Sequence, residues 1–185
     1  MPTPFDAVTT YLLAKDGNRP FLMRHAFAAD VHLEMVVRTD AITFPATADG
    51  LAAIEDTLSR RFAADFENAW TFALARPTDA NRRHFPCHWL VGLAAKADGA
   101  IRVGAGRYDW YFTPDEASLV ERLIITIDVM EILPPARQAA VFDWLSALPY
   151  PWCSPDDVLR GFPPIDQLAP VEAYLRAVGP IQPEH

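Results

Sequence analysis

The polar groups that could do chemistry gather in three stretches of the second half of the chain. His84 and His88 lie in HFPCH, and Tyr108 lies in GAGRYDWYF. Asp128 interrupts the apolar run 123–129, where a carboxylate is either exposed or enclosed in a pocket. Imidazoles and carboxylates transfer protons near neutral pH, and a tyrosine hydroxyl can donate a hydrogen bond to a developing oxyanion. These residue types are suited to acid–base chemistry and to hydrogen bonding of a ligand.

The spacing of the two histidines argues against a shared metal ion. An interval of four residues would suit a helical zinc site, but Pro86 and the following Trp89-Leu90-Val91 favour a strand. On a strand His84 and His88 share a face about 13 Å apart, at ~3.3 Å rise per residue, and one metal ion cannot bind both. We therefore expect no metal and no cofactor. Each histidine separately either lines a cavity or stands at a strand edge in contact with water.

Strand alternation decides which groups of GAGRYDWYF share a face. Tyr108, Trp110 and Phe112 fall on one face, together with two glycines that leave room for a close approach or mark a bend. Tyr108 either offers its hydroxyl to a ligand or is a core ring with a satisfied polar tip. Arg107 and Asp109 share the opposite face, where an ion pair is favoured over a catalytic pair.

Helices come first along the chain, and long strands follow. Apolar residues recur at helical intervals from Phe5 to Leu12 and again from Leu51 to Phe62. A second short helix around Phe21–His25 is expected to finish near residues 28–30. Further helices are expected over 136–148 and around 171–178.

Segments rich in β-branched and aromatic residues predict the strands. They are residues 31–37, 41–44, 69–75, 85–95, 101–112 and 119–132. Short connections with turn residues favour antiparallel pairing, so the predicted fold class is α+β with helices packed on one face of a sheet.

Composition restricts the class of protein. A chain of 185 residues, half of them hydrophobic, fits one domain with a substantial core. The net charge of −8, from 24 acidic and 16 basic side chains, argues against nucleic acid as a partner. Cys87 and Cys153 form no CxxC motif, which argues against a disulfide scaffold. Because no signal peptide and no run of ~18 apolar residues is visible, we expect a cytoplasmic protein without a membrane partner.

The order of elements resembles the nuclear transport factor 2-like superfamily, and its SnoaL-like members in particular. The residues that carry the resemblance are YLLAKD at 11–16, FAAD at 27–30, DGLAAI at 49–54, HWLVG at 88–92 and GRYDW at 106–110. The likeness spans roughly residues 5 to 133. It implies a cone-shaped, strongly curved antiparallel sheet wrapped around the N-terminal helices, a deep and mostly apolar pocket, and frequent homodimers through the outer sheet face.

The same resemblance suggests how the chain is divided. Residues 1–148 are expected to form the cone domain. Residues 149–185 are expected to form a proline-rich C-terminal extension that packs on it as a helical tail.

Ketosteroid isomerase, scytalone dehydratase and polyketide cyclases, all of this superfamily, perform acid–base chemistry without metal. The isomerase base falls at Met35 here, so it is missing, and the isomerase's second acid falls at or near Tyr108. The dehydratase histidine–phenylalanine pair matches His84-Phe85, but its catalytic aspartate falls at Leu13. Asp128 could take the aspartate role of the cyclases. No known catalytic set is complete.

We therefore expect a protein that binds a small apolar or aromatic molecule in the cone. The residues expected to line the ligand are Met35, Trp70, Trp110 and Phe112. If the protein is an enzyme, His84, His88 or Asp128 moves a proton and Tyr108 stabilises an enolate-like oxygen, in an isomerisation, dehydration or cyclisation. The alternatives are a non-catalytic binding or assembly module and a small subunit of the ring-hydroxylating dioxygenase type.

Overall fold

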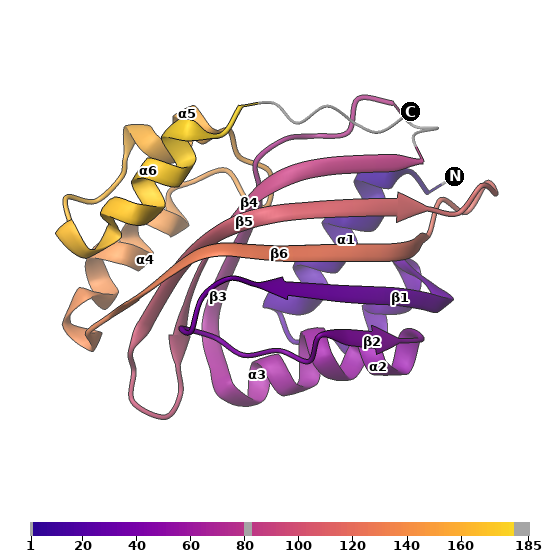
Figure 1. Cartoon of the computed structure of the whole chain (residues 1–185), viewed down its shortest axis with the longest axis horizontal. Helices are drawn as coiled ribbons and strands as arrows, with labels where there is room; N and C mark the ends of the chain where they lie inside the picture. Colours follow the sequence, from indigo (N-terminus) through magenta and orange to yellow (C-terminus); the bar gives the residue numbers. More distant parts are fainter. Residues whose placement is uncertain (1, 80–82, 180–185) are drawn as a thin grey trace.

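The computed structural model describes residues 2–79 and 83–179. In these ranges the strands form one six-stranded sheet in the order β2-β1-β6-β5-β4-β3, curved and open at both edges (Figure 1). The strands are β1 (Phe27–Val37), β2 (Thr47–Asp49), β3 (Phe66–Ala73), β4 (His84–Ala95), β5 (Ile101–Phe112) and β6 (Val120–Leu133). Neighbours pair antiparallel except β1 and β6, which are parallel.

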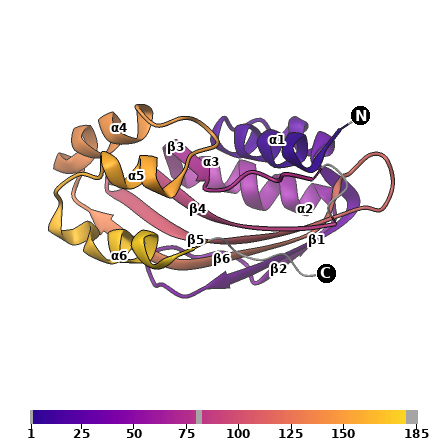
Figure 2. The same ribbon diagram turned by 90° about the horizontal axis from the view of Figure 1, so that it is seen from above.

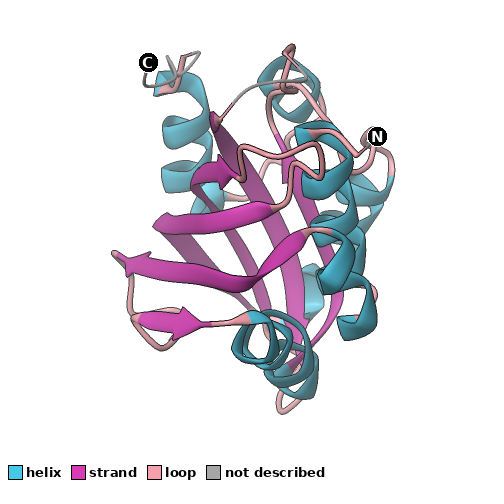
Figure 3. Ribbon diagram, turned by 90° about the vertical axis from the view of Figure 1, so that its right-hand side faces the viewer, coloured by secondary structure: helices cyan, strands magenta, loops and turns pink. Residues whose placement is uncertain are grey.

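The helices fall into an N-terminal and a C-terminal group along the chain, and Figure 3 shows helices on both sides of the sheet. The first group comprises α1 (Pro4–Asp16), the 3₁₀ helix η1 (Pro20–His25), and one continuous helical run made of α2 (Leu51–Glu55), the π-helical turn η2 (Asp56–Arg60) and α3 (Arg61–Asp65). The second group comprises η3 (Pro135–Arg137), α4 (Gln138–Ser146), α5 (Pro155–Arg160), η4 (Asp166–Leu168) and α6 (Ala169–Ala177).

The two groups cover opposite faces of the sheet. We call the face against α1, α2 and α3 the inner face, and the face against α4, α5 and α6 the outer face. Figure 2 shows α1 and α6 on opposite sides of the strands. Alternation along β4 is clear, because odd positions from Phe85 to Leu93 join the inner core while Leu90 and Ala94 join the outer core. The strand is therefore buried on both sides, which explains its nearly continuous apolar sequence.

Two glycines of β5 allow close packing on the inner face. At Gly104 an added Cβ would lie 2.7 Å from Cε of Met130, and at Gly106 it would collide with the carbonyl oxygen of Thr126 and the indole of Trp89. The room that these glycines leave is thus filled by the protein's own side chains and backbone. Gly106 also adjoins a β-bulge, at which the pairing of β5 with β6 shifts by one residue.

Two local predictions were wrong. Residues 28–30 do not end a helix but belong to β1, whose pairing with β6 is irregular between Phe27 and His32. Residues 41–44 are not a strand, because they pair with no neighbouring strand; Ile42 and Phe44 face the interior without belonging to the sheet. The short strand lies at Thr47–Asp49, where Ala48 pairs with Leu33.

The other strands and the longer helices agree with the sequence patterns to within a few residues. Neither α5 nor the π-helical turn was expected from the sequence patterns. In the described ranges no helix is both long and apolar enough to cross a membrane.

Replacing Gly106 with alanine tests the close packing on the inner face. Because the new methyl group would meet backbone atoms of β6 and not a flexible side chain, we expect Gly106→Ala to lower the free energy of unfolding by at least about 1–3 kcal/mol. Urea unfolding of Gly106→Ala, beside Gly179→Ala as a control with open space around its Cβ, measures this. Equal stability of the two variants would contradict the packing described.

Candidate functional site

A small cavity lies between the inner face of the sheet and the N-terminal helices. Its volume is about 40 Å³, and its wall is mostly apolar. The polar side chains in the wall are Tyr11, Lys15, Thr71 and Tyr108. For comparison, a cavity of about 150 Å³ is enough for a benzene molecule. The deep pocket expected from the resemblance is therefore nearly filled, and the remaining space suits water or a small chemical group.

Tyr11 of α1 and Tyr108 of β5 meet at this cavity. Their rings are edge to face with centroids 6.0 Å apart, and both side chains are buried. The two hydroxyls are close, but their contact lacks the geometry of a hydrogen bond, so the Tyr11 hydroxyl has no partner within the described chain. Burial raises the pKa of both tyrosines, so both hydroxyls stay protonated at neutral pH. The cavity thus presents hydrogen-bond donors.

Trp89 of β4 adds a third donor to the cavity wall. Its indole Nε1 is buried and has no hydrogen-bond partner among the described residues. A buried unpaired donor costs free energy that an acceptor placed beside it would recover. The unpaired donors therefore favour an occupant that carries an acceptor.

A buried carboxylate holds the end of α1 beside the cavity. Asp16 accepts four hydrogen bonds: from the Thr71 backbone N at 2.7 Å, the Thr71 hydroxyl at 2.8 Å, the Tyr150 hydroxyl at 2.9 Å and Lys15 Nζ at 3.1 Å. Lys15 Nζ also donates to the Thr71 hydroxyl and lies 4.1 Å from the centroid of the Phe62 ring. We call Lys15, Asp16, Thr71 and Tyr150 the Asp16 junction. It joins α1, β3 and the segment after α4.

Four of the residues predicted for the site lie on the inner face. Tyr108 and Met35 line the cavity. Trp110 and Phe112 are fully buried in the inner core but do not reach the cavity wall. Trp110 instead packs against Tyr11, with ring centroids 5.1 Å apart.

The other predicted residues lie on the outer face. Trp70 packs with Phe72 and Tyr150 in the outer core. Asp128 is the extra residue of the β-bulge in β6, between Ile127 and Val129, which directs it outward while Met130 returns to the inner face.

His84 and His88 also lie on the outer face, where they belong to hydrogen-bonded groups. His84 Nε2 lies 3.0 Å from Asp109, which also forms a two-point ion pair with Arg107. His88 Nδ1 lies 3.0 Å from the hydroxyl of Tyr174 on α6. Tyr108 is therefore separated by the sheet from the two histidines and from Asp128, and the four do not form one site.

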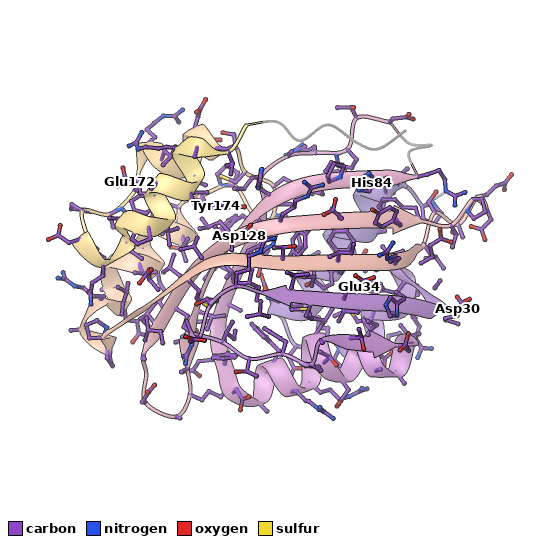
Figure 4. All side chains as sticks on the ribbon, viewed as in Figure 1. Asp30, Glu34, His84, Asp128, Glu172 and Tyr174 are labelled. Atoms are coloured by element: carbon purple, nitrogen blue, oxygen red, sulfur yellow. The ribbon has the colours of Figure 1, made fainter. Side chains whose placement is uncertain are left out.

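The Tyr174 hydroxyl connects α6 to the sheet. It donates to Asp128 Oδ2 at 2.9 Å, and Arg38 donates to Asp128 Oδ1 at 2.8 Å. Figure 4 shows Tyr174 beside Asp128, with His84 farther along the sheet. No group of three or more His, Cys, Asp or Glu in residues 2–79 and 83–179 could hold a metal ion.

Sequence reasoning missed Tyr11 and the Asp16 junction. Tyr11 fitted the apolar period of the first helix, and Lys15-Asp16 fitted a helix end, so neither pattern pointed to a site. The partners of Asp16 in β3 and after α4 lie 55 and 134 residues away in the chain. No local spacing could have brought them together.

Removing the Asp16 carboxylate would leave the ammonium group of Lys15 buried without its counter-ion. We expect Asp16→Ala to lower the free energy of unfolding by about 3–5 kcal/mol, and Asp56→Ala, which breaks the more exposed pair with Arg61, by less than about 1 kcal/mol. Urea unfolding compares the two. Losses of similar size would show that the junction does not depend on its carboxylate.

His88 makes stability depend on pH. Burial lowers its pKa below the ordinary 6.5, and the nearby Arg107 acts in the same direction, whereas a hydrogen bond to the Gly106 backbone and the charges of Asp128 and Asp109 oppose the shift. The unfolded chain therefore takes up the proton first as the pH falls, and stability is lost below about pH 6.5.

Two measurements check the direction of the His88 pKa shift and of its effect on stability. Its ring signals in an NMR titration of the folded protein should report a pKa below 6.5. The stability lost between about pH 7.5 and about pH 5.5 should be smaller in His88→Gln than in the wild type. A folded-state pKa at or above the ordinary value would contradict the described burial.

Comparison with known proteins supports the fold. No family model matches the sequence, and no curated protein matches it. Among solved structures, a nuclear transport factor 2-like superfamily protein from Salmonella enterica superposes with a TM-score of 0.54 at 14% identity, over 68% of this chain and 88% of that one. A hexachlorocyclohexane dehydrochlorinase superposes with a TM-score of 0.56 at 11% identity, over 69% of this chain and 84% of that one.

A third similar structure is a Mycobacterium tuberculosis protein in complex with estradiol-17beta-hemisuccinate. Its TM-score is 0.54 at 12% identity, over 70% of this chain and 98% of that one. At identities this low the likeness defines the fold and not the activity. The order of the strands, the curved open sheet and these superpositions together show that the chain has the nuclear transport factor 2-like fold.

Proposed function

We propose that the protein binds a small apolar molecule with a hydrogen-bond acceptor, such as a ketone, in the inner cavity. The hydroxyls of Tyr11 and Tyr108 donate to the acceptor, and the apolar wall holds the rest of the molecule. The observation that carries the proposal is the fully buried hydroxyl of Tyr11, which borders a cavity and has no partner in the described chain.

The chemistry of the wall favours binding over proton abstraction. Both tyrosine hydroxyls remain protonated at neutral pH because burial raises their pKa. No carboxylate or imidazole is among the described residues of the wall, and the Lys15 ammonium is engaged by Asp16 and Thr71. The cavity can polarise a carbonyl oxygen, but it offers no obvious base to remove a proton from the adjacent carbon.

Flexible side chains could enlarge the cavity for a ring-sized guest. Met35 and Met130 belong to the wall, and unbranched thioether side chains repack at low cost. Phe44 belongs to the connection between β1 and β2, outside the helices and strands. Displacement of these three side chains opens the space between the tyrosines and the edge of the sheet.

Two of the similar structures agree with a role in small-molecule binding. One holds an estradiol ester, and another is a dehydrochlorinase of a chlorinated cyclohexane. Both ligand and substrate have a largely apolar ring skeleton. Catalysis is the second candidate function for this chain. It would need His84, His88 or Asp128 to move protons, and these residues lie across the sheet from the cavity.

A matched pair of probes tests the need for an acceptor. Cyclohexanone and methylenecyclohexane have nearly the same shape, but only the ketone accepts a strong hydrogen bond. We expect cyclohexanone to bind the wild type more tightly by roughly 3-fold to 10-fold, and we expect Tyr11→Phe to lose this preference. Titration followed by protein NMR measures both affinities.

Tyr174→Phe is the matched control for the Tyr11 variant. It removes a tyrosine hydroxyl on the outer face and should leave the preference for the ketone unchanged. The proposal fails if neither probe binds, if the wild type binds both probes equally, or if Tyr11→Phe retains the preference.

A further inference from the structure

Arg102 of β5 stands at the rim of the inner cavity. It pairs directly with Leu93 of β4, a residue of the cavity wall, so both share the inner face. Its guanidinium lies 5.2 Å from the centroid of the Phe66 ring, and Phe66 packs on Phe62, another wall residue. These contacts place the positive charge next to the apolar space.

The guanidinium of Arg102 has spare hydrogen-bonding capacity. Its Nε donates to the carbonyl oxygen of Ala41 at 2.8 Å, while its Nη1 is buried and has no partner within the described chain. No carboxylate among the described residues lies within 4.0 Å of it. Eight other arginines do have a carboxylate within that distance: Arg38, Arg60, Arg61, Arg83, Arg107, Arg122, Arg160 and Arg176. The remaining described arginines, at 19, 24, 76 and 137, are exposed, whereas Arg102 is half-buried.

The lack of a carboxylate beside Arg102 is unexpected in a chain with so many acidic residues. With 24 acidic residues against 16 basic ones, carboxylate partners are plentiful. A guanidinium that is partly buried without one leaves a desolvated donor and an unbalanced charge. A carboxylate can satisfy two parallel N–H groups of a guanidinium at once, which a single backbone carbonyl cannot do.

The partner of Arg102 belongs to the segment that closes the cavity. Ile42 and Phe44, on either side of Thr43, place their side chains in the cavity wall. Over residues 39–44 the bond from Arg102 to Ala41 is the one hydrogen bond to other parts of the described chain. In Figure 1 this connection runs from the end of β1 back to β2, between the edge of the sheet and α3. We call residues 39–44 the mouth segment.

We propose that Arg102 recognises a carboxylate at the mouth of the inner cavity, so that the ligand is an amphipathic molecule with an apolar body and an anionic end. The carboxylate takes the guanidinium N–H groups, the Ala41 carbonyl is released, and the mouth segment moves away to admit the apolar body. This inference rests on the proposed function for the location of the ligand. It adds the charge of the ligand and the residue that selects it.

Octanoate and octanamide form the pair of probes that tests this inference. They share the same chain and differ in the charge of the end group. The wild type should bind octanoate more tightly than octanamide by roughly 10-fold to 100-fold. Arg102→Met, which keeps an unbranched apolar stem without the guanidinium charge, should abolish the difference while octanamide still binds. Isothermal titration calorimetry measures the four affinities.

Two further variants separate recognition from general effects. Arg61→Met removes a positive charge from a side chain that is 72% exposed and that has no part in the proposed recognition. This variant should retain the full preference for octanoate. Arg102→Lys keeps the charge but loses the planar fork, and should retain part of the preference even if Arg102→Met fails to fold. The amide NMR signal of Ile42, which follows the Ala41 carbonyl, should shift more with octanoate than with octanamide.

The outcomes distinguish this inference from the proposed function. Equal binding of octanoate and octanamide, absence of octanoate binding, or an equal effect of Arg61→Met overturns the role of Arg102. If cyclohexanone retains its Tyr11-dependent binding in that case, the proposed function survives alone. If octanoate selectivity depends on Arg102 while cyclohexanone shows no dependence on Tyr11, the proposed donor role of the tyrosines is overturned instead.

Discussion

The buried carboxylate of Asp16 is the interaction on which the arrangement of the molecule depends most. A charge removed from water is tolerated only when hydrogen bonds and an opposite charge replace the lost solvent, and here four donors do so, one of which is the Lys15 ammonium. Those partners come from α1, β3 and the segment after α4. A single carboxylate thus fixes the first helix, one edge of the sheet and the C-terminal region relative to one another, and holds the polar end of the cavity in place.

Burial of both faces of the sheet explains the shape of the core and the small size of the cavity. The inner face carries the large rings, and Trp89 and Met130 occupy the room left by Gly106 and Gly104. Aromatic packing is favourable enough that the cone closes on its own side chains. Some buried polar atoms at the cavity are hydrogen-bond donors without partners. These donors, more than the volume of the cavity, indicate which ligand the site would bind.

The fold was predictable from the sequence to a large extent, because it depends on local periods. The helical interval from Leu51 to Phe62 and the alternation in β4 and β5 predicted the elements and placed Tyr108 on the same face as Trp110. The site was much less predictable. The bulge that turns Asp128 outward adds a single residue and leaves no mark in the sequence pattern. The partners of Asp16 are distant in the chain, and Ile42 and Phe44 looked like strand residues because their apolar side chains fill the cavity wall.

The hydrogen bonds of Asp128 have a consequence for the relation between the two faces. One oxygen of this carboxylate accepts from Tyr174 on α6, and the other accepts from Arg38, the residue immediately before the mouth segment. A molecule that displaced α6 would remove one hydrogen bond from Asp128 and so change the charge that Arg38 meets. Because the Arg38 side chain is 65% exposed, a linkage of the two faces through Asp128 would be small, and it would act equally in both directions.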